Sequence, residues 1–162
     1  MALGAFGWQS FYYPAGGLML FGKRKRIVKR ILIVEDEPLT AFDNEVTLAD
    51  LGYEVVATLD RFSQAIELLD REQVDLVLSD VRLTGKHSGF DLARASKERG
   101  IPVLFSTGHK VPEEAKALAV GCLSKPYTER QLKNALEEVD KLLAGEAVKS
   151  AKGFELYPRV ES

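Results

Sequence analysis

The chain has 162 residues, of which 46% are hydrophobic and 28% are charged, so it is long enough for one domain with a hydrophobic core and too short for two ordinary domains. Its formal net charge of −2 hides an uneven distribution, because six of the 22 basic residues lie at positions 23–30 and the remaining 16 face 24 acidic ones. An acidic body argues against nucleic acid as the main partner, since duplex binding draws chiefly on phosphate neutralisation by Lys and Arg.

Cysteine usage indicates a reducing compartment. The single cysteine, Cys122, excludes an internal disulfide and a cysteine-based metal site. We therefore expect a cytoplasmic protein.

The first 22 residues are aromatic and glycine-rich, but Gln9, Ser10, Pro14 and five glycines interrupt the apolar run. A spanning helix needs about 20 predominantly apolar residues, and a signal peptide carries its basic residues before the apolar run rather than after it. We expect residues 1–29 to form a disordered extension without membrane contact. An upstream start choice, with Met19 as the true initiator, is the alternative.

From residue 30 onward, short β-branched runs alternate with longer amphipathic stretches, a pattern typical of βα units and a parallel sheet. Strands are predicted at 30–34, 53–59, 74–80, 101–107 and 122–124, and five helices between and after them. The third strand is almost continuously apolar, which predicts burial on both faces. This α/β domain is expected to span residues 30–144. Residues 145–162 form a tail too short for an output domain.

Helical periodicity predicts which residues face the core. In the first helix, Pro38 suits the first turn and Gly52 ends the helix. Thr128 and Gln131 form a capping box at the start of the last helix. The predicted inner faces are Phe42, Val46 and Ala49 in the first helix, Ala65, Ile66 and Leu69 in the second, and Leu132, Ala135, Leu136, Val139 and Leu143 in the last.

Polar residues gather at the carboxyl ends of the predicted strands, where open parallel sheets carry their functional groups. Singly, each has an ordinary explanation as a helix cap, a surface charge or a β-former. Together they bring several carboxylates close to each other, which repel unless a cation lies between them. Mg²⁺ prefers such oxygen ligands. The residues are Glu35, Asp36, Asp80, Thr107 and Lys125.

The motifs VEDEP, LSD, FSTG and SKP at these strand ends resemble those of the response regulator receiver family of two-component systems, over residues 30 to about 143. The resemblance implies a flavodoxin-like, doubly wound, five-stranded parallel sheet with strand order 2-1-3-4-5. It also implies a signalling protein rather than an enzyme, and the short tail after residue 145 predicts a stand-alone receiver.

The resemblance further implies a role for each matching residue. Asp80 corresponds to the aspartate that accepts a phosphoryl group from a histidine kinase or a histidine phosphotransfer protein. Lys125 and the hydroxyl of Thr107 would contact that phosphoryl group. The implied Mg²⁺ ligands are Glu35, directly or through water, Asp36, Asp80 and the backbone carbonyl of Arg82.

Three positions depart from the family pattern. Cys122 stands where the family usually has a switch Tyr or Phe, so the usual coupling of threonine movement to aromatic rotation cannot operate as such. Thr84 stands where the family commonly has proline. Ser106 replaces the alanine of a Phe-Ala-Thr-Gly motif that marks a subgroup of short alphaproteobacterial receivers, which often lack the switch aromatic and work with HWE and related histidine kinases.

Two further positions are candidates for setting the lifetime of an aspartyl phosphate. Arg82 and His109 lie two residues beyond Asp80 and Thr107, and we expect the long Arg82 side chain to hinder an attacking water. His109 and His87 are expected to be exposed loop residues rather than metal ligands, because Mg²⁺ favours oxygen.

Two other classes of function are alternatives. A haloacid-dehalogenase-type phosphatase also uses a strand-end aspartate with Mg²⁺, but it needs a second aspartate where this chain has Arg82. A pseudo-receiver that only binds partners would not need Glu35, Asp36, Asp80, Thr107 and Lys125 together. Within the receiver class, docking on a partner protein and draining a kinase as a phosphate sink both stay open.

Overall fold

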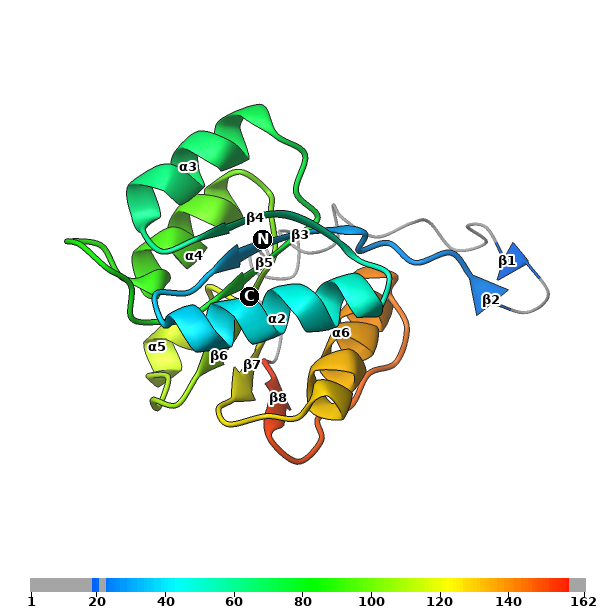
Figure 1. Cartoon of the computed structure of the whole chain (residues 1–162). Coiled ribbons are helices and arrows are strands. Elements are labelled where there is room, and N and C mark those ends of the chain that lie inside the picture. Colours follow the sequence, from blue (N-terminus) through cyan, green and yellow to red (C-terminus); the bar gives the residue numbers. More distant parts are fainter. Residues whose placement is uncertain (1–18, 21–22, 158–162) are drawn as a thin grey trace.

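A computed structural model describes residues 19–20 and 23–157 (Figure 1). A six-stranded sheet lies at the centre, and helices cover both of its faces. The sheet strands are β3 (Arg30–Val34), β4 (Glu54–Leu59), β5 (Leu76–Ser79), β6 (Val103–Thr107), β7 (Gly121–Ser124) and β8 (Phe154–Leu156). The helices are α2 (Pro38–Asp50), α3 (Phe62–Arg71), α4 (Gly89–Glu98), α5 (Glu113–Lys116) and α6 (Glu129–Leu143). A separate antiparallel pair joins β1 (Met19–Leu20) to β2 (Lys23–Arg24).

The strands follow the order β4-β3-β5-β6-β7-β8. The first five are parallel and confirm the predicted order 2-1-3-4-5. β8 is an additional strand, antiparallel to β7. Because every parallel strand ends at the same edge of the sheet, the residues that follow β3, β5, β6 and β7 are brought together there.

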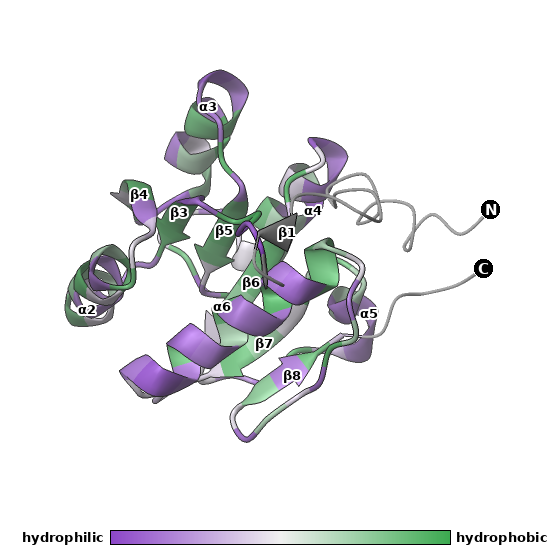
Figure 2. Ribbon diagram, turned by 90° about the vertical axis from the view of Figure 1, so that its right-hand side faces the viewer, coloured by the Kyte–Doolittle hydropathy of each residue, from purple (hydrophilic) through white to green (hydrophobic). Residues whose placement is uncertain are grey.

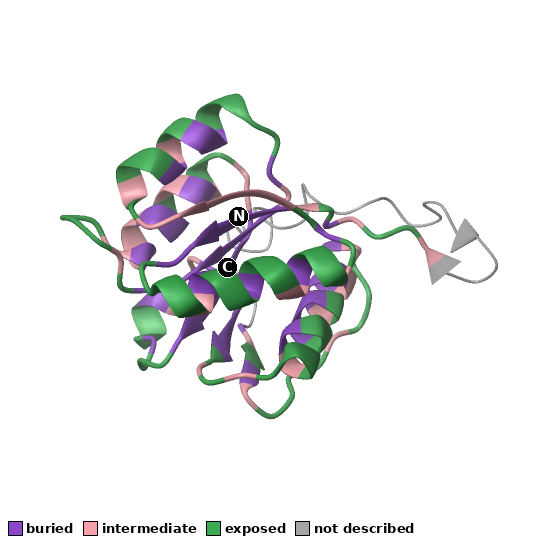
Figure 3. Ribbon diagram, viewed as in Figure 1, coloured by how far each residue is buried: buried purple, intermediate pink, exposed green. Residues whose placement is uncertain are grey.

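The central strands are hydrophobic and buried (Figures 2 and 3), and the two faces of the sheet bury separate sets of side chains. Along β3, Ile31 and Ile33 pack with the cluster that includes α2 and α6, whereas Leu32 and Val34 pack with the cluster that includes α3, α4 and α5. This alternation follows from the two-residue period of a strand. The residues of β5 and β6 are fully buried, as expected of central strands covered on both faces.

The predicted inner face of the first helix is wrong. Ala41, Asn44 and Leu48 are the buried residues of α2, whereas Phe42, Val46 and Ala49 point to solvent. Leu39, Phe42 and Val46 are 76%, 63% and 42% exposed. Apolar residues occupy two sides of this helix, so periodicity alone could not decide which side packs on the sheet.

The predicted inner faces of α6 and α3 are confirmed. All five predicted inner residues of α6 are buried, and its capping box between Thr128 and Gln131 is present. In α3, Ala65 and Leu69 are buried as predicted, Ile66 is partly buried against the same cluster, and Leu68 is buried in addition. A second capping box, between Ser88 and Asp91, starts α4.

Residues 24–29 are ordered, which corrects the expectation of disorder for this part of the extension. Asp140 of α6 accepts hydrogen bonds from the backbone amides of Ile27 and Val28, each at 2.8 Å, and also binds Arg24. Val28 is completely buried. The rest of the predicted extension, apart from residues 19–20 and 23, lies outside the described residues. Among the helices of residues 23–157, none is long and apolar enough to cross a membrane.

Candidate functional site

The predicted site residues meet at the carboxyl edge of the sheet. Glu35 follows β3, Asp80 follows β5, Thr107 ends β6 and Lys125 follows β7. Glu35, Asp80 and Thr107 are buried, whereas Asp36 is exposed. Burial of two carboxylates so close together requires compensating positive charge or hydrogen bonds.

Lys125 supplies that charge. Its Nζ lies 2.9 Å from Oδ2 of Asp80 and also bonds Oε1 of Glu35. The side chain therefore bridges the ends of β3 and β5 from the end of β7. An ammonium with three donors can hold both carboxylates at once.

Backbone amides hold the other oxygens of the two carboxylates. Oδ1 of Asp80 accepts hydrogen bonds from the amides of Val81 at 2.6 Å and Arg82 at 3.4 Å. Oε2 of Glu35 accepts one from the amide of Glu37 at 3.2 Å. These bonds fix the orientation of each carboxylate, so Oδ2 is the Asp80 oxygen turned toward the lysine.

Burial and pairing act in opposite directions on the charges of this site. Burial raises the pKa of the Glu35 carboxyl above its ordinary value, and the bond from Lys125 opposes this rise without cancelling it. For Lys125, burial acts to lower the pKa, but the bonds to Glu35 and Asp80 outweigh it and the pKa is raised. The lysine therefore keeps its positive charge across the physiological pH range.

The acidic residues form a set suited to a hard cation. One oxygen each from Glu35, Asp36 and Asp80 lie within 4.8 Å of one another. Such a set of carboxylates fits Mg²⁺, which takes oxygen ligands and keeps several waters. The exposure of Asp36 leaves room for those waters on the solvent side.

Gly89 allows α4 to start directly against the phosphoacceptor candidate. A Cβ at this position would lie 1.9 Å from the carbonyl oxygen of Asp80 and 2.7 Å from Cα of Val81. The amide of Gly89 donates to the carbonyl of Val81 at 2.8 Å. Only glycine fits this approach, a role that the sequence did not reveal.

Thr107 lies beside the site, and its backbone carbonyl accepts a hydrogen bond from the amide of Lys125 at 2.9 Å. Its hydroxyl oxygen accepts one from the amide of His109 at 3.1 Å. A hydroxyl that accepts still has its own hydrogen to donate. His109 and Arg82 are both exposed at the rim of the site, as predicted for His109.

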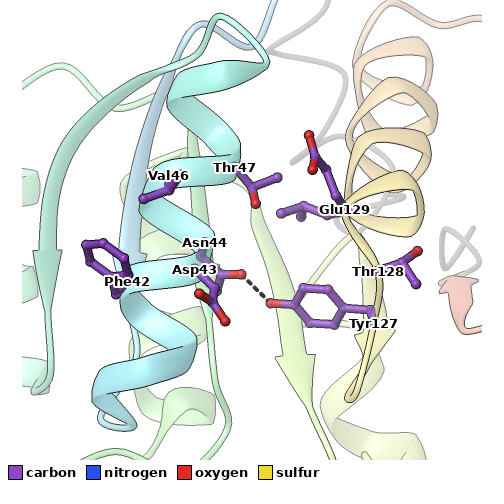
Figure 4. A pocket seen from close by; sticks show the side chains of 9 residues that line it. Phe42, Asp43, Asn44, Val46, Thr47, Tyr127, Thr128 and Glu129 are labelled. Carbon is purple, nitrogen blue, oxygen red and sulfur yellow. Dashed lines mark hydrogen bonds between the residues drawn. The ribbon is translucent and has the colours of Figure 1, made fainter.

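A groove leads from the surface to Asp80. Its lining includes Glu37, Thr40, Asp80, Gly108, His109 and Lys125. A second pocket adjoins it between α2 and the start of α6, with Asp43, Asn44 and Tyr127 common to both (Figure 4). The phosphoacceptor candidate is thus reachable from solvent along α2.

A buried hydrogen-bond chain behind the groove was missed by sequence reasoning. The hydroxyl of Tyr127 donates to Oδ1 of Asn44 at 2.7 Å (Figure 4) and lies 2.9 Å from Oγ of Ser106. Asn44 is only 3% exposed. These hydrogen bonds join α2 to β6 and to the loop after Lys125, so they fix the positions of three elements that line the site. The one signal in the sequence was Asn44, a polar residue in α2, the helix whose inner face was predicted wrongly.

Cys122, at the usual switch position, is buried, and its paired residue across the sheet edge is Glu155 of β8. Burial raises the pKa of its thiol. Tyr157, just after β8, packs in the same apolar cluster. The aromatic ring near Cys122 therefore comes from the C-terminal segment rather than from β7.

This fold and site define a doubly wound α/β domain with a lysine-bridged acidic site at the carboxyl ends of its strands. The response regulator receiver domain family matches residues 31–137. The chain therefore belongs to this family, in which phosphorylation of an aspartate is characteristic.

Several known proteins are similar to the chain. The transcriptional regulatory protein PdtaR of Mycobacterium tuberculosis is 32% identical over 116 residues, which cover 68% of this chain and 56% of PdtaR. The chemotaxis response regulator CheY4 of Vibrio cholerae has 28% identity and a TM-score of 0.61, covering 69% of this chain and 98% of that one. The receiver domain of the sensor histidine kinase PA1611 from Pseudomonas aeruginosa, with a magnesium ion coordinated in its active site cleft, has 26% identity and a TM-score of 0.61, covering 74% and 99%. The chain spans little more than half the length of PdtaR.

Proposed function

We propose that this chain is a phosphoacceptor that takes a phosphoryl group onto Asp80 from the phosphohistidine of a histidine kinase or a histidine phosphotransfer protein. The observation that carries the proposal is the geometry of the Asp80 carboxylate. Backbone amides hold Oδ1, Oδ2 faces Lys125, and a groove connects the side chain to solvent. A nucleophile held in one orientation beside a fixed positive charge suits in-line phosphoryl transfer.

In this proposal Oδ2 of Asp80 attacks the phosphorus, and a new P–O bond forms as the P–N bond to the partner's imidazole breaks. The imidazole leaves with the electron pair of that bond. Lys125 offsets the charge on the phosphoryl oxygens. Its contact with a phosphoryl oxygen replaces its present bond to the Asp80 carboxylate. Thr107 donates its free hydroxyl hydrogen to a phosphoryl oxygen, and Gly108, which lacks a side chain, lets the following loop approach the phosphoryl group.

We assign Glu35, Asp36, Asp80 and the backbone carbonyl of Arg82 as the residues that would hold Mg²⁺. The mutual closeness of the three carboxylates supports this assignment, as does the magnesium ion coordinated in the cleft of the PA1611 receiver domain. When bound, Mg²⁺ neutralises charge on the phosphoryl group during transfer.

The exposed apolar side of α2 supports docking of a helical partner next to the groove. Leu39, Phe42 and Val46 lie on this side, and Phe42 and Val46 also line the pocket that adjoins the groove (Figure 4). Exposed apolar side chains that recur along one face of a helix favour packing against another helix. A kinase that presents its phosphohistidine on a helix could dock here and place the imidazole at Asp80.

The two downstream roles open from the sequence make different demands on the partner. A regulator would bind a downstream protein only when Asp80 carries the phosphoryl group, whereas a phosphate sink would drain the kinase without further contact. We infer that the chain acts by one of these routes rather than as an enzyme with turnover on a small substrate. Arg82 occupies the position where a dehalogenase-type phosphatase needs an acid, which favours this reading.

Intact-mass measurement after incubation with Mg²⁺ and acetyl phosphate, or with a phosphorylated histidine kinase, tests the proposal. We expect one phosphoryl adduct on the wild type and none on Asp80→Asn. Asp60→Asn is the matched control, because its carboxylate is half-exposed and pairs with Arg61 away from the groove. An Asp80→Asn chain that still takes the adduct, or a wild type that takes none from any donor, would contradict the proposal.

A further inference from the structure

The edge of the sheet is covered by the chain's own C-terminal segment. β8 pairs antiparallel with β7, with Gly121, Cys122 and Leu123 opposite Leu156, Glu155 and Phe154 (Figures 1 and 2). The pairing extends by one bond at each end, from the amide of Tyr157 to the carbonyl of Val120 at 3.0 Å and from the amide of Ser124 to the carbonyl of Gly153 at 2.8 Å. Without β8, these backbone groups of β7 would form an open sheet edge.

Gly121 lets a strand come unusually close to β7. A Cβ at Gly121 would lie 2.5 Å from the carbonyl oxygen of Glu155, a distance that real side chains do not adopt. The clash would be with backbone, so any strand in the position of β8 meets the same limit. The glycine thus shapes the β7 edge for an added strand whatever that strand's side chains are.

Two aromatic residues anchor the segment on opposite faces of the sheet. Phe154 is 4% exposed and packs with the α6 side of the core, whereas Tyr157 is 6% exposed and packs with the α5 side. Removal of β8 would therefore leave two apolar cavities, one on each face, at the positions of aromatic residues three places apart. Pockets for particular side chains give strand addition its specificity.

A positive charge beside the edge adds a third recognition feature. Lys116 of α5 lies 3.1 Å from the carboxylate of Glu155, and its Nζ lies 5.6 Å from the centre of the Tyr157 ring. An acidic residue between the two aromatic ones therefore meets a cation. The sequence Phe154-Glu155-Leu156-Tyr157 therefore indicates which residue types a strand at this edge should carry.

β8 is also short enough to leave independently of the sheet. It has three residues, and a segment from residue 144 to residue 153 connects it to α6. Short edge elements open locally at a lower free energy than central strands. The central parallel strands β3, β5 and β6, by contrast, are joined by helices and are buried.

We propose that the β7 edge is a docking surface for an extended segment of a partner protein, with the pattern aromatic, acidic, apolar, aromatic, and that β8 occupies this surface as an intramolecular stand-in. The partner segment adds to the sheet antiparallel to β7 and fills the Phe154 and Tyr157 cavities after β8 has left. Because β7 runs directly into Lys125, this surface lies on the same strand as the phosphoryl site.

Binding of a labelled peptide with the sequence of residues 150–157 to full-length protein tests the surface. Phe154→Ala/Tyr157→Ala weakens the hold of β8. Glu155→Cys places a thiol opposite Cys122, the single cysteine of the chain, so that oxidation locks β8 in place and reduction frees the same protein. We expect the peptide to bind the double variant, folded by circular dichroism, about ten-fold or more tighter than the oxidised Glu155→Cys protein. A peptide with alanine at both aromatic positions should bind neither.

Equal binding to both proteins, or no binding to the folded double variant, would overturn the proposal. A wild type that forms a dimer by exchanging β8, without capturing the peptide, would assign the surface to a second copy of the chain and overturn it as well. All measurements are made without Mg²⁺ or a phosphodonor, so no phosphoryl transfer takes place in them. The outcome is therefore independent of whether Asp80 is a phosphoacceptor.

Hydrogen exchange in the wild type gives a second test that needs no variant. The Tyr157 and Ser124 amides, which make the outermost bonds of the pairing, should exchange at least about ten-fold faster than the Val77 and Asp80 amides of the central sheet. Equal protection of the two sets would mean that β8 leaves only on global unfolding, and a stand-in that cannot leave would rule out the docking surface.

Discussion

Gly89→Ala should strongly destabilise the protein, because α4 starts against backbone atoms of the strand end that carries Asp80. The new methyl carbon would lie 1.9 Å from the Asp80 carbonyl oxygen and 2.8 Å from its carbonyl carbon. No flexible side chain can move aside, so α4 or the end of β5 must shift. Overpacking of this kind costs about 1–3 kcal/mol, and the helix preference of alanine over glycine returns at most about 1 kcal/mol. A backbone contact as short as 1.9 Å lies at the upper end of this range, so the net loss in the free energy of unfolding should be about 2 kcal/mol.

Urea unfolding measures this loss. With a slope of about 1–3 kcal/mol per molar urea, the midpoint should fall by about 1 M. Gly108→Ala is the matched control, since a Cβ there meets nothing closer than the Cβ of Lys125 at 3.9 Å, and its midpoint should stay close to that of the wild type. If both variants unfold at the wild-type midpoint, α4 does not need the close approach at Gly89 and the reasoning fails.

Three further changes test the contacts around the core. Asp140→Ala leaves two backbone amides of the segment before β3 without their acceptor. It should lower the free energy of unfolding, measured by thermal unfolding, by about 2–4 kcal/mol. Asp140→Asn keeps one oxygen and should lower it clearly less. Tyr127→Phe removes the hydroxyl that bonds the buried Asn44 and should lower the free energy of unfolding by about 1–3 kcal/mol, whereas unchanged stability would mean that the bond has no net value. The backbone bond from Ser88 lowers the pKa of Asp91, so the ionised carboxylate stabilises the fold above its unfolded pKa of about 3.9 and this contribution disappears as pH falls through the lower folded value. The gap in urea midpoint between wild type and Asp91→Asn should accordingly be larger at pH 7 than at about pH 3, and an equal gap would refute the assignment.

Much of the fold and the site followed from local sequence. Alternating β-branched and amphipathic segments predicted the five parallel strands, and the capping box at Thr128 predicted the start of α6, because both signals depend on neighbouring residues only. The residues at the strand ends, among them Asp80 and Lys125, could be proposed as one site because parallel strands end at one edge of a sheet.

Tertiary structure decided what local sequence left open. α2 carries apolar residues on two sides, so packing on the sheet selected Ala41, Asn44 and Leu48 for burial and left Phe42 exposed. Three residues are too few for a strand signal in the tail, and β8 exists because the β7 edge, with Gly121, accepts it. The fit of Gly89 against Asp80 and the bond from Asn44 to Tyr127 likewise join residues far apart in the chain. Contacts of this kind depend on the relative placement of whole elements, which residue patterns within one element do not encode.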